Sequence, residues 1–176
     1  MNRQLSQGRP WRAALLLLLL VVVLPAAACR PPQTPLAHTF DSPDALAREV
    51  LDRLARRDQA GLLALALSHD EFETHVWPRL PASRPERNTP LSFVWGRLKQ
   101  QSDMSLAGTV ARHGGTRHEL QQVVFDGEVT DYGTYTVHRE SALVVGMPDG
   151  TTDRIRVFGS VIEQGGRYKV FSYVVD

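Results

Sequence analysis

The hydrophobic pattern of the sequence changes once, near residue 115, and this change constrains the fold more than any other feature. Before it, apolar residues recur at intervals of three and four, which indicates helices. After it, apolar and polar residues alternate in segments separated by turn residues, and no further helical pattern follows. Helices followed by hairpin-connected strands predict an α+β fold, in which N-terminal helices pack on a curved antiparallel sheet.

Three short helical patterns precede one long pattern. The first begins after Ser42, the second after Asp58, and the third at a capping box formed by Ser68 and Glu71. The long helix is predicted over residues 89–112, where apolar residues repeat on one face.

The segment between the third and the long helix, residues 77–90, contains four prolines, which exclude a regular helix. Trp77, Leu80 and Pro81 are predicted to hold this segment against the core. As a functional element it would be a lid over a pocket or a loop that docks a partner. The alternative is a plain connection that covers the helices.

The strand pattern occupies four segments, at residues 118–125, 135–147, 152–163 and 168–175. Turn signals separate the last three, so these strands are expected to be antiparallel. The sequence therefore predicts a sheet of about four strands. Together with the helices it forms a single domain over residues 42–176, a normal length for one core.

The first 28 residues have the pattern of a bacterial export signal. Three arginines and no acidic residue precede twelve apolar residues at 13–24, and Pro25 and three alanines follow. The apolar run is shorter than the roughly 20 residues of a spanning helix. An uncleaved membrane anchor is the alternative. Residues 29–41, which are rich in proline, are predicted to form an extended tether.

Cys29 is the only cysteine in the chain, so an internal disulfide is excluded. The sequence AAAC that ends at Cys29 resembles the lipobox of bacterial lipoproteins. This resemblance implies diacylglycerol on Cys29 and a protein anchored in the membrane of the cell envelope. Because Arg30 follows instead of an aspartate, it points to the outer membrane, on the periplasmic side. Ala26 and Ala28 also fit an ordinary signal-peptidase cut, which would leave Cys29 as a free thiol.

Several partner and cofactor classes have no support in the sequence. Loss of residues 1–28 and their three arginines would leave 17 basic and 19 acidic side chains with no basic cluster, which argues against a nucleic-acid partner. His113 and His118 are separated by two glycines, and no metal-binding motif occurs, so no metal site is predicted. The sequence has no glycine-rich phosphate loop and no GxSxG motif, and no cofactor is predicted.

The order of elements over residues 42–176 resembles the nuclear transport factor 2-like superfamily, which includes SnoaL-like cyclases and ketosteroid isomerase. The resemblance rests on element order and not on a residue motif. It implies a cone in which helices pack into a strongly curved sheet and leave a pocket at the open end. A cystatin-like or another helix-on-sheet fold is the alternative.

Aromatic residues with polar tips suit a pocket that is mainly apolar with a few hydrogen bonds. The predicted ligand-binding residues are Trp95, Tyr132, Tyr135, His138 and Tyr173, with Phe158 and Phe171 as further lining candidates. The acid–base candidates are His75, Asp131 and His138, because histidine titrates near neutral pH and a carboxylate beside a tyrosine can move a proton. The alternatives are core packing for the aromatic residues and solvated or capping roles for the others.

Two functional hypotheses follow. The first is a non-enzymatic, membrane-tethered module that binds a small apolar ligand or an envelope protein. The second is an exported isomerase, dehydratase or cyclase of the same fold, in which a histidine or aspartate faces a tyrosine. A purely structural subunit of an envelope assembly is a third possibility.

Overall fold

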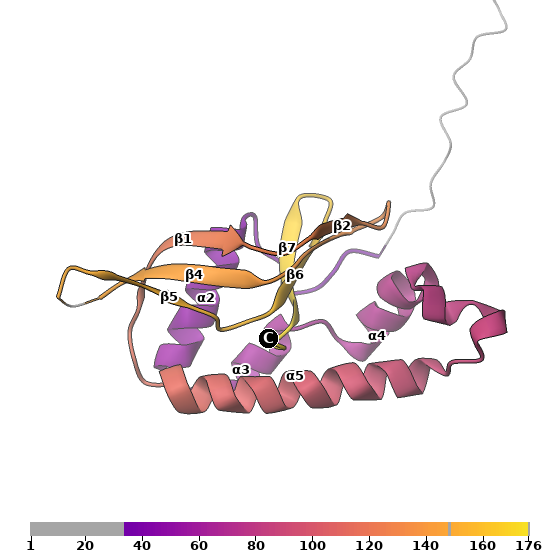
Figure 1. The fold of residues 1–176 in the computed structure, drawn as a ribbon, viewed down its shortest axis with the longest axis horizontal. Coiled ribbons are helices and arrows are strands. Elements are labelled where there is room, and N and C mark those ends of the chain that lie inside the picture. The colour runs from indigo at the N-terminus through magenta and orange to yellow at the C-terminus, as the bar shows by residue number, and fades with distance from the viewer. Residues whose placement is uncertain (1–33, 148, 176) are drawn as a thin grey trace, which may run out of the picture. The chain divides into compact units, whose positions relative to one another are not determined.

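A computed structural model describes residues 34–147 and 149–175 of the chain. The predicted export signal and Cys29 lie outside these described residues. Residues from Pro35 onward form one compact unit (Figure 1). No helix in the described part of the chain is long and apolar enough to cross a membrane.

The helices begin where their capping residues predict. The α-helices are α2 (Pro43–Ala55), α3 (Gln59–Leu65), α4 (His69–Glu71) and α5 (Leu91–His113). The Ser42 hydroxyl accepts a hydrogen bond from the backbone N–H of Ala45, and Asp58 accepts one from Gly61. Ser68 and Glu71 form the reciprocal capping box at the start of α4. Each cap satisfies backbone donors that the first helical turn leaves open.

Between α4 and α5 the chain forms short turns of other helical types. A π-helical turn, η1 (Phe72–Val76), continues α4, and three 3₁₀ turns follow: η2 (Trp77–Arg79), η3 (Pro81–Ser83) and η4 (Pro85–Arg87). The predicted absence of regular helix after residue 77 is confirmed. Trp77 and Leu80 pack against the core as expected, whereas Pro81 is exposed. Pro81 is the first residue of η3.

The strands form two antiparallel sheets, and the α+β fold is confirmed. The strands are β1 (Glu119–Phe125), β2 (Val129–Asp131), β3 (Thr136–His138), β4 (Ser141–Gly146), β5 (Thr152–Ile155), β6 (Ser160–Gln164) and β7 (Arg167–Ser172). One sheet has the order β1-β4-β5 and the other β2-β3-β6-β7. Two of the four predicted strands are therefore each divided between the sheets, and β2 is an additional strand.

The strands bend sharply where they pass from one sheet to the other. Backbone hydrogen bonds continue through the bend, from Asp126 N–H to Glu140 O at 3.1 Å and from Ser141 N–H to Gly159 O at 2.8 Å. Glu140 has a φ of +52°, a conformation that side-chain-bearing residues rarely adopt. A Cβ at Gly159 would lie 1.6 Å from the carbonyl oxygen of Val174. The bend therefore requires glycine at position 159.

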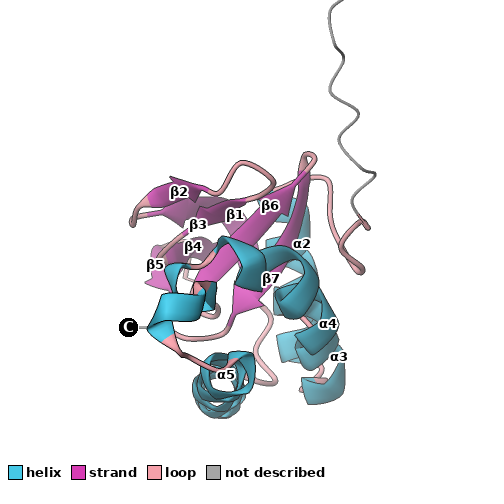
Figure 2. Cartoon of the chain, turned by 90° about the vertical axis from the view of Figure 1, so that its right-hand side faces the viewer, coloured by secondary structure: helices cyan, strands magenta, loops and turns pink. Residues whose placement is uncertain are grey.

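The hydrophobic core has two parts, because both faces of the second sheet are covered (Figure 2). Val161 belongs to the part that packs around α2, whereas Ile162, the next residue of β6, belongs to the part around η1. Neighbouring residues of a strand point to opposite faces, which explains this division. The residues of the second part are Leu36, Leu67, Phe72, Val76, Tyr135, Val137 and Ile162, all buried.

The folded unit also includes the end of the predicted tether. Leu36 is buried, and Phe40 exchanges two backbone hydrogen bonds with Tyr168 of β7. The Lys169 ammonium donates to the carbonyl oxygen of Ala37 at 2.7 Å, and the Ala37 N–H donates to Glu71. These contacts attach residues 36–40 to β7 and to the end of α4, so the predicted tether does not extend as far as residue 41.

Candidate functional site

A cavity of about 350 Å³ lies between the first half of α5, the turn η1 and one face of the sheet β2-β3-β6-β7. We call it the inner pocket. Its lining residues are Phe72, Val76, Leu80, Val94, Leu98, Gln101, Tyr132, Tyr135, Val137, Arg139, Ser160, Phe171, Ser172 and Val174. Apolar and aromatic side chains dominate this set, and the volume falls in the range of about 300–1,000 Å³ that is typical of small-molecule sites.

The Tyr135 hydroxyl is the most unusual polar group of the inner pocket. Tyr135 is only 3% exposed, and its hydroxyl has no hydrogen-bond partner within the described structure. Its ring stacks on that of Tyr132 with centroids 4.8 Å apart. Burial and the neighbouring Tyr132 raise the pKa of Tyr135, and the opposing charge of Arg79 does not offset them. The hydroxyl therefore stays protonated and can donate a hydrogen bond.

A buried hydroxyl without a partner costs roughly 1–3 kcal/mol relative to one that is satisfied. Buried polar groups in native proteins are nearly always paired with protein atoms, water or a ligand. The other polar groups lining the inner pocket are those of Gln101, Tyr132, Arg139, Ser160 and Ser172, and the lining contains no carboxylate and no imidazole. The inner pocket can thus hold an apolar body and offer a small number of hydrogen bonds.

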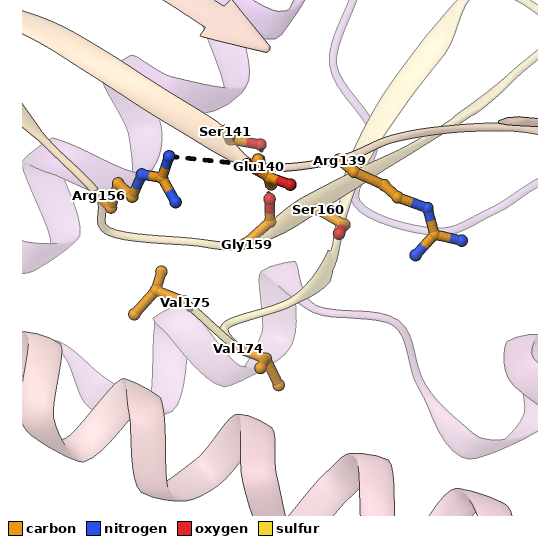
Figure 3. Close-up of a pocket in the computed structure, with 8 residues that line it drawn as sticks. All are labelled: Arg139, Glu140, Ser141, Arg156, Gly159, Ser160, Val174 and Val175. Atoms are coloured by element: carbon orange, nitrogen blue, oxygen red, sulfur yellow. Dashed lines mark hydrogen bonds and ion pairs between the residues drawn. The ribbon is translucent and has the colours of Figure 1, made fainter. Parts of the chain in front are cut away.

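A smaller cavity of about 90 Å³ lies at the bend of the strands (Figure 3). We call it the bend pocket. It shares Arg139, Ser160 and Val174 with the inner pocket, so the two cavities adjoin. Its other charged residues are Arg156 and Glu140, whose side chains approach to 3.8 Å. The positive φ of Glu140 places backbone strain at this same point, and strained residues of this kind cluster at functional sites.

His138, predicted both as an acid–base group and as a ligand contact, does not line the inner pocket. Its Nε2 atom is 2.8 Å from a carboxylate oxygen of Glu163, and its ring lies 4.8 Å from that of Phe125. Val137, its neighbour in β3, does line the pocket. Alternation along the strand therefore places His138 on the opposite face, beside Tyr168.

The other two acid–base candidates have local structural partners. Asp131 is exposed, and its carboxylate accepts a hydrogen bond from Gly133 N–H at 2.6 Å in the turn after β2. His75 is buried on η1, and its Nδ1 atom is 3.4 Å from the amide nitrogen of Gln164. Neither residue lines the inner pocket. Each of His75, Asp131 and His138 thus has a different partner, and the described structure shows no contact among the three.

The predicted aromatic residues separate into three groups. Tyr132, Tyr135 and Phe171 line the inner pocket. Trp95 does not line the pocket, but its ring centroid lies 5.3 Å from that of the lining residue Phe72. The remaining two aromatic candidates, Phe158 and Tyr173, are buried in the core around α2 and line neither the inner nor the bend pocket.

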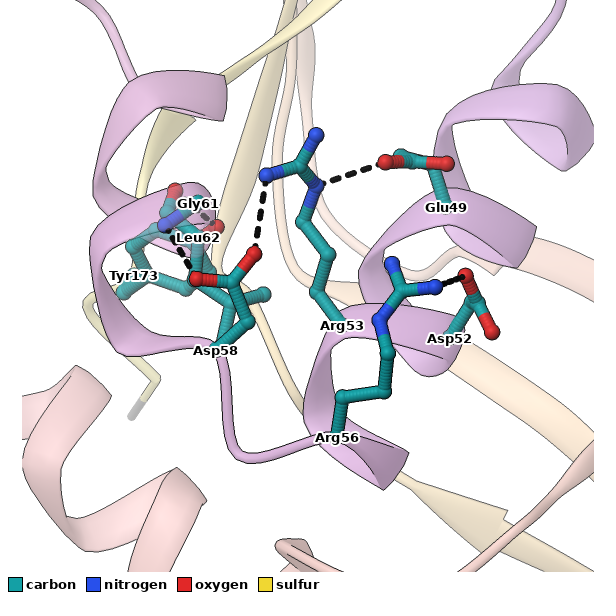
Figure 4. Close-up of polar contacts among 8 residues, drawn as sticks. All are labelled: Glu49, Asp52, Arg53, Arg56, Asp58, Gly61, Leu62 and Tyr173. Carbon is teal, nitrogen blue, oxygen red and sulfur yellow. Dashed lines mark hydrogen bonds and ion pairs between the residues drawn. The ribbon is translucent and has the colours of Figure 1, made fainter.

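Tyr173 has a satisfied hydroxyl, in contrast to Tyr135. It donates a hydrogen bond of 2.7 Å to the carbonyl oxygen of Leu62 in α3 (Figure 4). The nearby Asp58 caps α3 and also pairs with Arg53 of α2 at 3.1 Å. Tyr173 and this polar network hold α3 between α2 and the end of β7, which is a structural role.

Several pocket residues were not identified from the sequence. Phe72 and Val76 of η1 and Val94 and Leu98 of α5 are spaced by four and look like ordinary core positions. The available signal was the capping box at Ser68, which fixes the start of the turn that carries Phe72 and Val76. A π-helical turn often accompanies a functional site, but its single wide turn leaves no mark in the sequence.

Neither a search for metal-binding clusters nor comparison with known proteins adds information about the site. No group of three or more histidine, cysteine, aspartate or glutamate side chains is placed to hold a metal ion within residues 34–147 and 149–175. Comparison with protein-family models, with curated proteins and with solved structures found no match to this chain.

Proposed function

We propose that this protein is a lipid-anchored module of the bacterial cell envelope that binds a small apolar ligand in the inner pocket without catalysing its conversion. The observation that carries the proposal is Tyr135, which lines a largely apolar cavity and whose buried hydroxyl has no hydrogen-bond partner among the described residues. A ligand with one hydrogen-bonding group would satisfy this hydroxyl and cover the surrounding aromatic and aliphatic side chains.

The alternative of an isomerase, dehydratase or cyclase has weaker support. Such chemistry needs an acid or base within reach of the substrate. The lining contains no histidine, aspartate, glutamate, cysteine or lysine. The His138–Glu163 pair has the right chemistry for proton transfer, but it lies on the other face of the sheet from the inner pocket. Turnover that is lost in the His138→Ala variant would favour the enzyme.

The proposed fold family is the nuclear transport factor 2-like superfamily. Three features support this proposal, because a cone is expected to have them. Helices precede the strands, the strands continue from one sheet into the other, and a pocket lies between a long helix and a sheet. In this proposal the inner pocket is the interior of the cone, and the turns η2 to η4 form part of its rim.

The proposed anchor is a lipid on Cys29. The contacts of Leu36 and Phe40 with the folded unit support a short tether, because few residues then separate Cys29 from the domain. With Arg30 after the cysteine, the proposed location is the outer membrane, facing the periplasm. A partner protein in the envelope remains compatible with this arrangement, with the loop at residues 77–90 as its docking site.

Incorporation of a fatty-acid analogue in cells tests the anchor. We expect labelling of the wild-type chain and none of the Cys29→Ala variant, because no other cysteine is present to carry the lipid. If the wild type carried no more label than the Cys29→Ala variant, the cut would be an ordinary signal-peptidase cut. Mass spectrometry of the mature N-terminus provides the control for processing.

Fluorine NMR of the fluorotyrosine-labelled full chain in phospholipid nanodiscs tests the pocket. The chain has four tyrosines, at positions 132, 135, 168 and 173, and Tyr→Phe variants assign their resonances. Addition of dodecanol, a neutral apolar probe with one hydroxyl, should shift the Tyr132 and Tyr135 resonances with saturation. The Tyr173 resonance should stay in place, because its hydroxyl is bonded to Leu62. Unchanged Tyr132 and Tyr135 resonances would exclude binding in the inner pocket.

A further inference from the structure

Arg139 lies where the inner pocket and the bend pocket meet, since it lines both. It is the only charged residue in the lining of the inner pocket. Arg139 follows directly after β3, is exposed, and extends its side chain away from Glu140 (Figure 3). The two pockets also share Ser160 and Val174 in their linings. A ligand in the inner pocket would therefore meet one positive charge, at one end.

Arg156 has carboxylate partners that compensate its charge, whereas Arg139 has none in the described structure. Arg156 has two carboxylates within ion-pair distance, Asp126 at 3.4 Å and Glu140 at 3.8 Å. For Arg139, no ion pair is formed with any carboxylate of residues 34–147 or 149–175. Figure 3 shows the side chains of Arg139 and Arg156 on opposite sides of Glu140. Glu140 thus pairs with Arg156, and the guanidinium of Arg139 can bind an anionic group of a ligand.

A second positive charge lies near the inner pocket. Arg79 of η2 lies close enough to Tyr135 for its charge to oppose the effect of burial on that hydroxyl. The lining of the inner pocket contains no aspartate or glutamate to offset these two arginines. The field at the polar end of the inner pocket therefore favours a negative group, while the remainder of the wall favours hydrocarbon.

We infer that the ligand is a single-chain amphiphile with an anionic head group, whose alkyl chain occupies the inner pocket and whose head group contacts Arg139. This inference rests on the proposed function, because it presumes that the inner pocket binds a ligand. A guanidinium can bind either a carboxylate or a phosphate through two parallel hydrogen bonds. Tyr135, whose buried hydroxyl has no partner among the described residues, lines the same cavity.

The test uses the labelled full chain in nanodiscs and three ligands with the same alkyl chain: dodecanoate, dodecyl phosphate and dodecanol. Dissociation constants come from the saturable shift of the Tyr135 resonance, in the wild type and in the Arg139→Gln variant. We expect the substitution to weaken binding of at least one anion about tenfold and to leave dodecanol nearly unchanged. Because each ligand is compared between two proteins, its partition into the lipid cancels.

The matched control is Arg154→Gln, which removes an arginine of the bend that pairs with Asp126 and lines neither pocket. It should leave all three affinities unchanged. A loss for dodecanoate alone identifies a carboxylate head group, and a loss for dodecyl phosphate alone identifies a phosphate. Equal affinities in wild type and Arg139→Gln for all three ligands would overturn the inference but not the proposed function. If no ligand shifts Tyr135, both fail.

Discussion

Replacement of Lys169 by alanine is expected to lower the free energy of unfolding by about 3–5 kcal/mol, the usual result of removing one partner from a buried ion pair. Lys169 is 1% exposed, and its ammonium lies 3.1 Å from the Glu71 carboxylate. The variant leaves that carboxylate without its cation and leaves the Ala37 carbonyl without a donor. Urea denaturation of the full chain in nanodiscs, followed by near-UV circular dichroism, measures the loss.

The control for Lys169 is Lys99→Ala, which removes the lysine of the exposed Lys99–Asp103 pair on α5. Exposed pairs of this spacing contribute about 0.3–0.5 kcal/mol. The two substitutions should therefore differ several-fold in their effect. Equal effects would contradict the role assigned to the Lys169–Glu71 pair, which is to fix residues 36–40 against β7 and the end of α4.

Replacement of Tyr173 by alanine should lower the free energy of unfolding by about 3–5 kcal/mol, because it leaves a large cavity in the core and an unpaired Leu62 carbonyl. The Tyr173→Phe variant removes the hydroxyl alone and should cost about 1–2 kcal/mol. Tyr135→Phe removes a hydroxyl that has no partner among the described residues, so we expect its stability without ligand to be unchanged or slightly higher. Denaturant titrations of the three variants provide the comparison.

The two phenylalanine variants together separate a structural hydroxyl from one kept for binding. Tyr173→Phe should lose stability and retain the affinity of the wild type for dodecanol. Tyr135→Phe should retain stability and lose affinity, which the Tyr132 resonance can report. Loss of stability in Tyr135→Phe would indicate that its hydroxyl has a partner within the folded protein, and the main support for the inner pocket would disappear.

Much of the fold follows from local sequence signals, because helix starts depend on a few neighbouring residues. Ser42, Asp58 and Ser68 cap helices as their positions predict. The division of the strands between two sheets depends on a distant contact instead. Gly159 must lie against the carbonyl of Val174, and no pattern within either segment indicates that contact.

The residues of the candidate site also depend partly on contacts between distant segments. Tyr135, directly before β3, and Val137 within it both line the inner pocket, and the alternation of the strand excludes His138 from it. For Tyr173 alternation is not a guide, because β7 ends at Ser172 and the chain changes direction. Which face of β3 borders a cavity is decided by the packing of α5 and η1, which the strand sequence does not encode.

We propose that a small apolar ligand occupies the inner pocket. Photo-crosslinking of the full chain in nanodiscs with a diazirine analogue of dodecanol, mapped by mass spectrometry, tests it most directly. We predict crosslinks at Phe72, Tyr135 and Phe171 that an excess of dodecanol removes and that Tyr135→Phe weakens. Crosslinks confined to exposed apolar residues of α5 such as Phe93 and Met104, unaffected by either change, would contradict the account.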